Sequence, residues 1–139
     1  MKNSTTLIIS TLFIATFGFG QTTYVPDDNF EQALIDLGYD DVLDDYVLTE
    51  NISGVTELYV GEKEISDLTG IEGFTALTYL NCYNNQLTSL DLNANTVLED
   101  LRCHFNQLTS LDVSSNTVLT FFRGGSNQSR RLDVSSNTA

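Results

Sequence analysis

The chain has 139 residues and a formal net charge of −13, with six Lys and Arg against nineteen Asp and Glu. A charge of this sign repels phosphate backbones, which excludes nucleic-acid binding for the domain as a whole. It also argues against docking on anionic membranes, and the length suits one domain.

Residues 1–20 have the pattern of a secretory signal peptide. Lys2 supplies a positive charge, residues 7–17 form an apolar run, and Gly18 and Gly20 precede a cleavage position before Gln21. The run is too short for a membrane span, so a membrane anchor or a buried strand is the weaker alternative. We therefore predict a secreted, extracellular chain with no integral membrane segment after cleavage and a charge of −14, because Lys2 leaves with the leader.

Residues 21–54 are acidic and non-repetitive, and we expect them to cap the domain. An apolar stripe at helical spacing predicts a short amphipathic helix over residues 28–37. Asp28 and Glu31 form a plausible capping box, and Gly38 is a helix stop. The stripe consists of Phe30, Ala33, Leu34 and Leu37.

The segment from Asp40 to Asp45 alternates acidic pairs with one apolar pair. An EF-hand calcium loop needs oxygen ligands at alternate positions, a central Gly and a terminal Glu. Val42 at the third position and Asn51 at the twelfth do not meet that requirement. The segment predicts a solvated turn with Val42 and Leu43 pointing inward, and a calcium loop is the weaker alternative.

Residues 55–139 contain a repeat with a period of 22 and then 21 residues. The units are 55–76, 77–97, 98–118 and 119–139, and the pattern L-x-x-L-x-[LC]-x-x-N-x-L marks a leucine-rich-repeat solenoid. We predict an α/β-class fold of three to four coils, with short parallel strands stacked in one sheet and an N-terminal helical cap. Gly124 and Ser129 replace buried residues, which predicts a degenerate, poorly held last coil. Because the chain stops at a repeat boundary, it also suggests a piece of a longer array.

Cys82 and Cys103 occupy the same position of successive repeats. That position points inward, where cysteine behaves as a small buried hydrophobe. Adjacent strands are close enough for a disulfide, so the pair is either a reduced ladder, which we favour, or a bridge.

Asn85, Asn106 and Asn127 recur where each coil turns away from its strand. An amide at this point can donate to and accept from backbone groups that the turn leaves unpaired. We predict that these residues form a second structural ladder and have no catalytic role.

The outward strand positions form the concave sheet face, where we expect ligand binding. Aromatic residues and arginine are enriched at protein-interface hot spots, which favours a protein partner, and exposed tyrosine also suits a glycan. The alternative is that the side chains only stabilise neighbouring strands through cross-strand pairs. The candidate residues are Tyr59, Tyr79, Asn81, Tyr83, Arg102, His104, Phe121 and Arg123, with Glu57, Gly61, Asp100 and Gly125 completing the outward positions.

No catalytic, cofactor or metal site is predicted. His104 is the only histidine and should be a solvated surface residue. The chain has no GxSxG elbow and no HExxH motif. Asp91, Asp112 and Asp133 share one repeat position, where we expect solvated turn acceptors, with weak calcium bridging as the alternative.

The segments "VPDDNFEQALIDLG" and "ISDLTGIEGFTALTYLNCYNNQLTSLDL" resemble bacterial internalin-like leucine-rich-repeat proteins of the cysteine-ladder subtype. The resemblance covers residues 24–139 and implies a surface adhesin or binding module, either released or held at the cell surface. The sequence therefore predicts a secreted, non-enzymatic recognition module that binds a protein, or less favourably a glycan. The alternative is a truncated N-terminal spacer of a longer surface adhesin with no binding site of its own.

Overall fold

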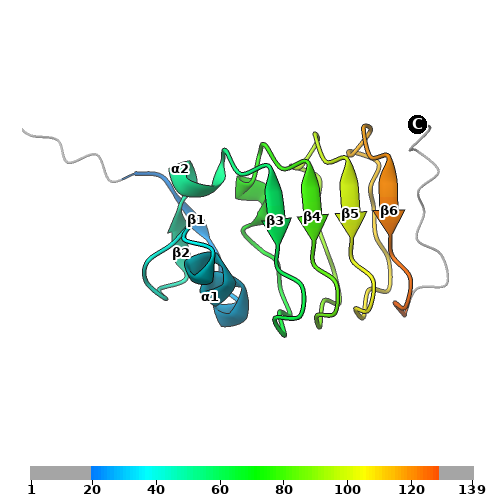
Figure 1. Cartoon of the computed structure of the whole chain (residues 1–139), viewed down its shortest axis with the longest axis horizontal. Coiled ribbons are helices and arrows are strands. Elements are labelled where there is room, and N and C mark those ends of the chain that lie inside the picture. The colour runs from blue at the N-terminus through cyan, green and yellow to red at the C-terminus, as the bar shows by residue number, and fades with distance from the viewer. Residues whose placement is uncertain (1–19, 129–139) are drawn as a thin grey trace, which may run out of the picture.

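The computed structural model describes residues 20–128, which form a cap followed by a row of stacked coils (Figure 1). In Figure 1, β1, β2, α1 and α2 lie at one end, and four parallel strands follow beside them. In chain order the elements are β1 (Thr22–Tyr24), α1 (Asp28–Asp36), β2 (Tyr46–Leu48), α2 (Thr49–Ile52), β3 (Glu57–Tyr59), a 3₁₀ helix (Ile71–Gly73), β4 (Tyr79–Asn81), β5 (Asp100–Arg102) and β6 (Phe121–Arg123).

The four strands of the row form one parallel sheet in the order β3-β4-β5-β6. Leu58 pairs with Leu80 and Leu80 pairs with Leu101, so the register follows the 22- and 21-residue offsets of the sequence. Pairing continues past the strand ends, for example from Cys82 N to Arg102 O at 2.9 Å. Successive coils therefore stack in register, and the predicted leucine-rich-repeat solenoid is confirmed.

The core lies inside the coils and continues into the cap. Leu58, Leu80 and Leu101 are completely buried at equivalent positions of successive strands. Helix α1 adds Phe30, whose ring centroid is 6.4 Å from that of Phe74 in the first coil. The helix thus covers the end of the stack, as a capping element must, because a terminal coil has no neighbour to cover its apolar interior.

Helix α1 matches the predicted helix to within one residue, but its N-terminal cap differs from the prediction. The N-cap is Asp27, whose Oδ1 accepts hydrogen bonds from Asn29 N and Phe30 N at 3.0 Å each. The predicted capping box of Asp28 and Glu31 is wrong, because the helix starts one residue earlier than that box requires. At the other end, Gly38 has a φ of +80° and its N–H bonds to Ile35 O, which confirms the predicted stop.

The same Asp27 carboxylate joins the cap to the first coil. Its second oxygen, Oδ2, accepts from Ser66 N at 2.9 Å, from Ser66 Oγ at 2.7 Å and from Asp67 N at 3.0 Å. Burial alone would raise the pKa of Asp27, but the hydrogen bonds from Ser66, Phe30 and Asp67 outweigh it and lower the pKa. One side chain therefore both starts helix α1 and ties it to a turn 39 residues away.

The turn at residues 40–45 corrects a second prediction, because Val42 and Leu43 are 51% and 49% exposed instead of pointing inward. The turn is held by a buried polar group: Glu31 Oε1 accepts from Asp44 N at 3.0 Å and from Tyr46 N at 3.1 Å. Val47 supplies the buried apolar contact at this end. With the backbone anchored by Glu31, the apolar pair is not needed in the core.

The predicted asparagine ladder is present, and each amide bonds to two successive coils. Asn106 Nδ2 donates to Cys82 O at 3.0 Å and to Cys103 O at 3.1 Å, and its Oδ1 accepts from Leu87 N at 3.0 Å. Asn85 and Asn127 make the equivalent bonds one coil earlier and one coil later. These bonds satisfy buried backbone groups that the turn leaves without partners.

The first coil has Lys63 at the asparagine position, and the structure explains the departure. No earlier coil lies beyond it, so an amide there would have no carbonyl of a previous coil to bind. Lys63 N instead donates to Asn85 Oδ1, and its Nζ lies 3.4 Å from Asp36 Oδ2 of the cap helix. The substitution thus connects the first coil to the cap.

A second ladder of amides lies on the side of the coils opposite the sheet. Asn95 Nδ2 donates to Ile71 O at 2.9 Å and to Phe74 O at 3.1 Å. Asn116, also fully buried, donates to Leu92 O and Asn95 O, one coil further along. This ladder was not predicted from the sequence, although Asn95 and Asn116 lie 21 residues apart, at one repeat position.

Cys82 and Cys103 are both fully buried and carry free thiols in the structure. Burial raises the pKa of Cys103 to about 12, and burial followed by the nearby Cys103 raises the pKa of Cys82 well above its ordinary value. Both cysteines therefore act as packing residues, as a reduced ladder requires. The predicted weakening of the last coil at Ser129 falls outside residues 20–128, as do Asp133 and residues 1–19 of the predicted signal peptide.

Candidate functional site

We define the sheet face as the outward side of β3–β6 together with the outward residues that follow each of these strands. The register places its side chains in three rows that cross the strands. The first row is Glu57, Tyr79, Asp100 and Phe121; the second is Tyr59, Asn81, Arg102 and Arg123; and the third runs from Gly61 through Tyr83 and His104 to Gly125. The structure thus brings together all eight candidate residues that the sequence indicated.

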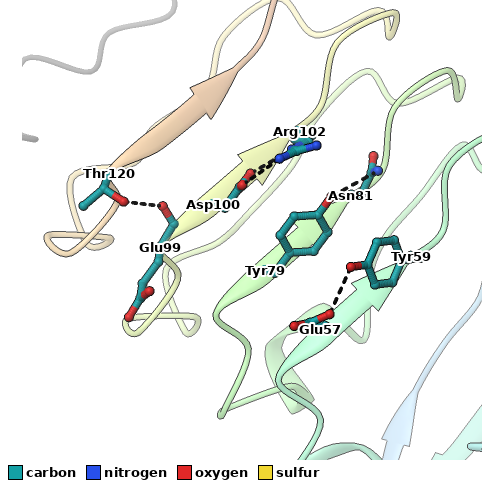
Figure 2. Close-up of polar contacts among 8 residues, drawn as sticks. All are labelled: Glu57, Tyr59, Tyr79, Asn81, Glu99, Asp100, Arg102 and Thr120. Carbon is teal, nitrogen blue, oxygen red and sulfur yellow. Dashed lines mark hydrogen bonds and ion pairs between the residues drawn. The ribbon is translucent and has the colours of Figure 1, made fainter.

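The first two strands carry a pair of tyrosines on this face (Figure 2). The ring centroids of Tyr59 and Tyr79 are 4.9 Å apart with the planes tilted by 35°. Tyr59 Oη donates to Glu57 Oε2 at 3.0 Å, and Asn81 Nδ2 lies 3.4 Å from Tyr79 Oη. The Glu57 carboxylate raises the pKa of Tyr59, because it stabilises the protonated hydroxyl. Both hydroxyls are therefore held by neighbouring side chains.

Arg102 connects the tyrosine pair to the last described strand. Its guanidinium makes a two-point contact with Asp100, with Nε to Oδ1 at 3.1 Å and Nη2 to Oδ2 at 3.0 Å (Figure 2). The guanidinium carbon lies 5.1 Å from the ring centroid of Tyr79 and 5.0 Å from that of Phe121. Such cation–π contacts contribute about 0.5–1 kcal/mol each at exposed sites. Tyr59, Tyr79, Arg102 and Phe121 thus form one continuous stack across all four strands.

A second group lies where the strands end. The Tyr83 and His104 rings are stacked, with centroids 5.2 Å apart and planes at 14°. A Cβ on Gly61 would collide with Cδ1 and Cε1 of the Tyr83 ring, so the small residue makes room for that ring. Phe105, which is 55% exposed, belongs to the same group, because its ring centroid lies 5.3 Å from that of His104. Phe105 was not predicted as a functional residue, and its only signal in the sequence is an aromatic side chain at the position that Asn84 holds in the previous repeat.

His104 is buried, which corrects the prediction of a solvated side chain. Only 9% of it is exposed, because Tyr83 and Phe105 cover it. Burial lowers the pKa of His104, and the charges of Arg123 and Arg102 lower it further. A neutral, stacked imidazole is therefore the form that the sheet face contains near neutral pH.

Arg123 differs from the other two basic residues within residues 20–128. Lys63 pairs with Asp36 and Arg102 pairs with Asp100, whereas Arg123 is exposed and makes no ion pair within the described chain. It lies directly opposite Arg102 in the register. The β6 end of the sheet face is thus positive although the domain is strongly acidic.

The other polar clusters of the described chain have structural roles. Asp91 Oδ1 accepts from Asn93 N at 3.0 Å and Asp112 Oδ1 from Ser114 N at 2.9 Å, so both are the predicted turn acceptors. A cavity of about 360 Å³ lies beside Asp91, between Leu68 and Leu90, outside the sheet face. Within residues 20–128, no group of three or more His, Cys, Asp or Glu is placed to hold a metal ion.

These features define the class of protein: a leucine-rich-repeat solenoid with a helical N-terminal cap, a cysteine ladder and an aromatic, arginine-containing sheet face. Two solved structures share this architecture. The functional domain of InlJ from Listeria monocytogenes, which includes a cysteine ladder, superposes with a TM-score of 0.75 at 39% identity. An internalin, InlF, from Listeria monocytogenes strain 4b F2365 superposes with a TM-score of 0.70 at 26% identity.

Sequence comparison agrees with the structural comparison. Internalin J of Listeria monocytogenes serotype 4b (strain F2365) is 38% identical over 85 residues, which cover 58% of this chain. No model of a protein family matches the chain. The resemblance to internalin-like leucine-rich-repeat proteins is therefore confirmed by both sequence and structure.

The chain covers only a small part of each relative. The aligned residues span 9% of Internalin J, and the superposed residues span 27% and 33% of the two solved chains. Of these, the InlJ superposition covers 85% of the present chain and the InlF superposition 81%. None of the helices within residues 20–128 has the length and apolar character needed to cross a bilayer.

Proposed function

We propose that this chain is a secreted, non-enzymatic recognition module that binds a protein through its sheet face. The observation that carries the proposal is the stack of Tyr59, Tyr79, Arg102 and Phe121, which presents hot-spot residue types on a rigid surface. Because the side chains are held by one another, little side-chain entropy remains to be lost on binding. The resemblance to internalins supports recognition over chemistry.

The arrangement of the rings favours a protein over a glycan. Sugar rings bind aromatic side chains by stacking on an open face, but Tyr59 and Arg102 already lie against Tyr79. Gly61 and His104 likewise lie against the Tyr83 ring. Tyr59 and Phe121, at the two ends of the stack, remain 52% and 47% exposed. Because Tyr79 and Arg102 separate them, these two rings suit the irregular contacts of a protein surface.

The same stacking also supports a second candidate, a spacer of a longer surface protein. Cross-strand aromatic and Arg contacts stabilise a sheet even when nothing binds to it. In that case Tyr79, Tyr83 and Arg102 would matter for stability alone. The two candidates differ in one measurable property, which is whether a ligand depends on this face.

The test uses the exported chain, residues 21–139, as bait for a phage-displayed library of random peptides. We expect ligands whose affinity falls at least about tenfold on the combined change Tyr79→Ala, Tyr83→Ser and Arg102→Ala, equal to about 1.4 kcal/mol. The control variant changes exposed Val97 and Val118 to Ser, away from the sheet. Ligands that bind the triple variant as well as the parent would refute binding through the sheet face.

Stability is separated from binding by a second pair of variants. Tyr59→Ser and Phe121→Ser alter residues that are 52% and 47% exposed, so both variants should keep the parent's circular dichroism spectrum. We expect each to weaken a ligand of the sheet face without lowering the melting temperature by more than a few degrees. Loss of stability with unchanged affinity would instead favour the spacer. Export is tested separately by N-terminal sequencing, which should begin at Gln21.

A further inference from the structure

The charges on the sheet face are arranged unevenly. Glu57 lies on β3, and Glu62 follows that strand, so the edge beside the cap is acidic. At the opposite edge, Arg102 and Arg123 lie side by side on β5 and β6. The face therefore has a negative and a positive end.

The pairing of two arginines would ordinarily be unfavourable. Like charges directly opposite on neighbouring strands repel and destabilise the sheet. For Arg102 part of this cost is offset by Asp100, which binds the guanidinium through the two-point contact. Arg123 has no such carboxylate within the described chain and is exposed beside Phe121. Among residues 20–128 its charge thus has no carboxylate partner on the very surface that we propose for binding.

We infer that Arg123 receives a carboxylate from the protein partner, with Phe121 receiving an adjoining apolar group. The inference rests on the proposed function and specifies the partner's chemistry: an Asp, a Glu or a C-terminal carboxylate next to an apolar side chain. A guanidinium binds a carboxylate through two parallel hydrogen bonds, which sets orientation as well as affinity. A partner carboxylate also relieves the repulsion between Arg102 and Arg123.

The polarity of the face sets the orientation of the partner. The acidic groups beside β3 disfavour a carboxylate at that edge, whereas the β6 edge attracts it. Because the full chain carries a net charge of −13, a uniformly acidic partner would be repelled. The partner surface must therefore be acidic only where it meets Arg123.

The experiment measures the affinity of peptides selected on the sheet face for charge variants of the bait. In Arg123→Gln we expect at least about tenfold weaker binding. In Arg123→Lys we expect a smaller loss, because lysine keeps the charge but cannot make the two parallel hydrogen bonds of a guanidinium. The matched control is Lys63→Gln, which removes the same charge from a residue outside the sheet face. Changing the peptide's acidic residue to its amide should weaken binding to the parent but not to Arg123→Gln.

The outcomes separate this inference from the proposed function. Peptides that lose affinity on the triple variant but not on Arg123→Gln would overturn the carboxylate inference and leave recognition through the sheet face intact. If no peptide loses affinity for the triple variant, the proposed function itself fails. If no such peptide is found and an acidic glycan binds in an Arg123-dependent way, the inference that the partner is a protein would be overturned.

Discussion

The Asp27 carboxylate offers a sharp test of how the cap is joined to the repeats. Asp27→Ala removes two hydrogen bonds at the start of helix α1 and three from Ser66 and Asp67. Loss of an N-cap costs about 0.5–2 kcal/mol. The three other bonds involve a charged acceptor at an exposed site, so water replaces part of what is lost and about 1–2 kcal/mol more is expected.

We therefore expect Asp27→Ala to lower the free energy of unfolding by about 3 kcal/mol and the melting temperature by roughly 10 °C. Asp27→Asn should lower the free energy of unfolding by less, because asparagine is an equally good N-cap. Part of the loss remains, since its amide turns a donor toward the donors of Ser66 and Asp67. The matched control is Asp28→Ala, which removes the same charge from the neighbouring exposed position. Urea unfolding followed by circular dichroism measures all three variants.

The pH dependence of Asp27 provides an independent readout. Its lowered pKa means that the unfolded chain binds a proton more readily than the folded chain. The stabilisation is fully present above the ordinary value of 3.8 and is lost as the pH falls through the folded pKa. Asp27→Asn should reduce this loss of stability at acidic pH, and Asp28→Asn should not. Equal effects of the changes at both positions, in urea or in acid, would refute the role assigned to Asp27.

Four further outcomes are expected. Asn106→Ala should cost about 2–4 kcal/mol, because three buried backbone groups lose their partner; calorimetry measures it, and a loss below about 1 kcal/mol would contradict the ladder. A thiol reagent at pH 8 should leave Cys103 unmodified in the folded chain, since its pKa is about 12, and rapid labelling without unfolding would contradict this burial. The free energy of unfolding should fall as the pH drops from above 6.5 through the lowered pKa of His104, because the unfolded chain binds the proton first. His104→Gln should remove this part of the pH dependence, and an unchanged pH profile in the variant would contradict the role of His104. Glu31→Gln should raise the melting temperature, because the buried Oε2 of Glu31 lacks a partner in the described chain. The glutamine oxygen keeps the acceptor for Asp44 N and Tyr46 N. A large decrease in melting temperature would show that the buried charge of Glu31 is compensated.

The sequence predicted what the repeat itself encodes. The period brings Leu80 and Leu101 into register, and the recurrence of Asn85 and Asn106 predicts their shared turn contacts. The order of the sheet-face residues follows from the same periodicity, since alternate strand positions point outward. These predictions succeed because every coil repeats the environment of its neighbour.

The cap could not be predicted in the same way. The bonds of Asp27 join residues 39 and 40 positions apart, and Glu31 anchors a turn 13 and 15 residues later. No period relates these partners, so the sequence favoured the local capping box at Asp28. Likewise, the burial of His104 depends on ring contacts with Tyr83 from another coil and with Phe105, and neither contact recurs in the next described coil. Contacts that occur only once in a chain leave no recurring signal.

The asparagine ladder also has a direction. Each amide bonds to the carbonyl of the coil before it, as Asn106 does with Cys82 and Asn127 with Cys103. Inserting one whole 21-residue unit would thus add both the new donor and the acceptor that the next unit requires. The 22-residue first coil keeps the same relay, since Asn85 donates to Val60 O. Gene duplication could therefore lengthen such an array without redesigning either neighbour.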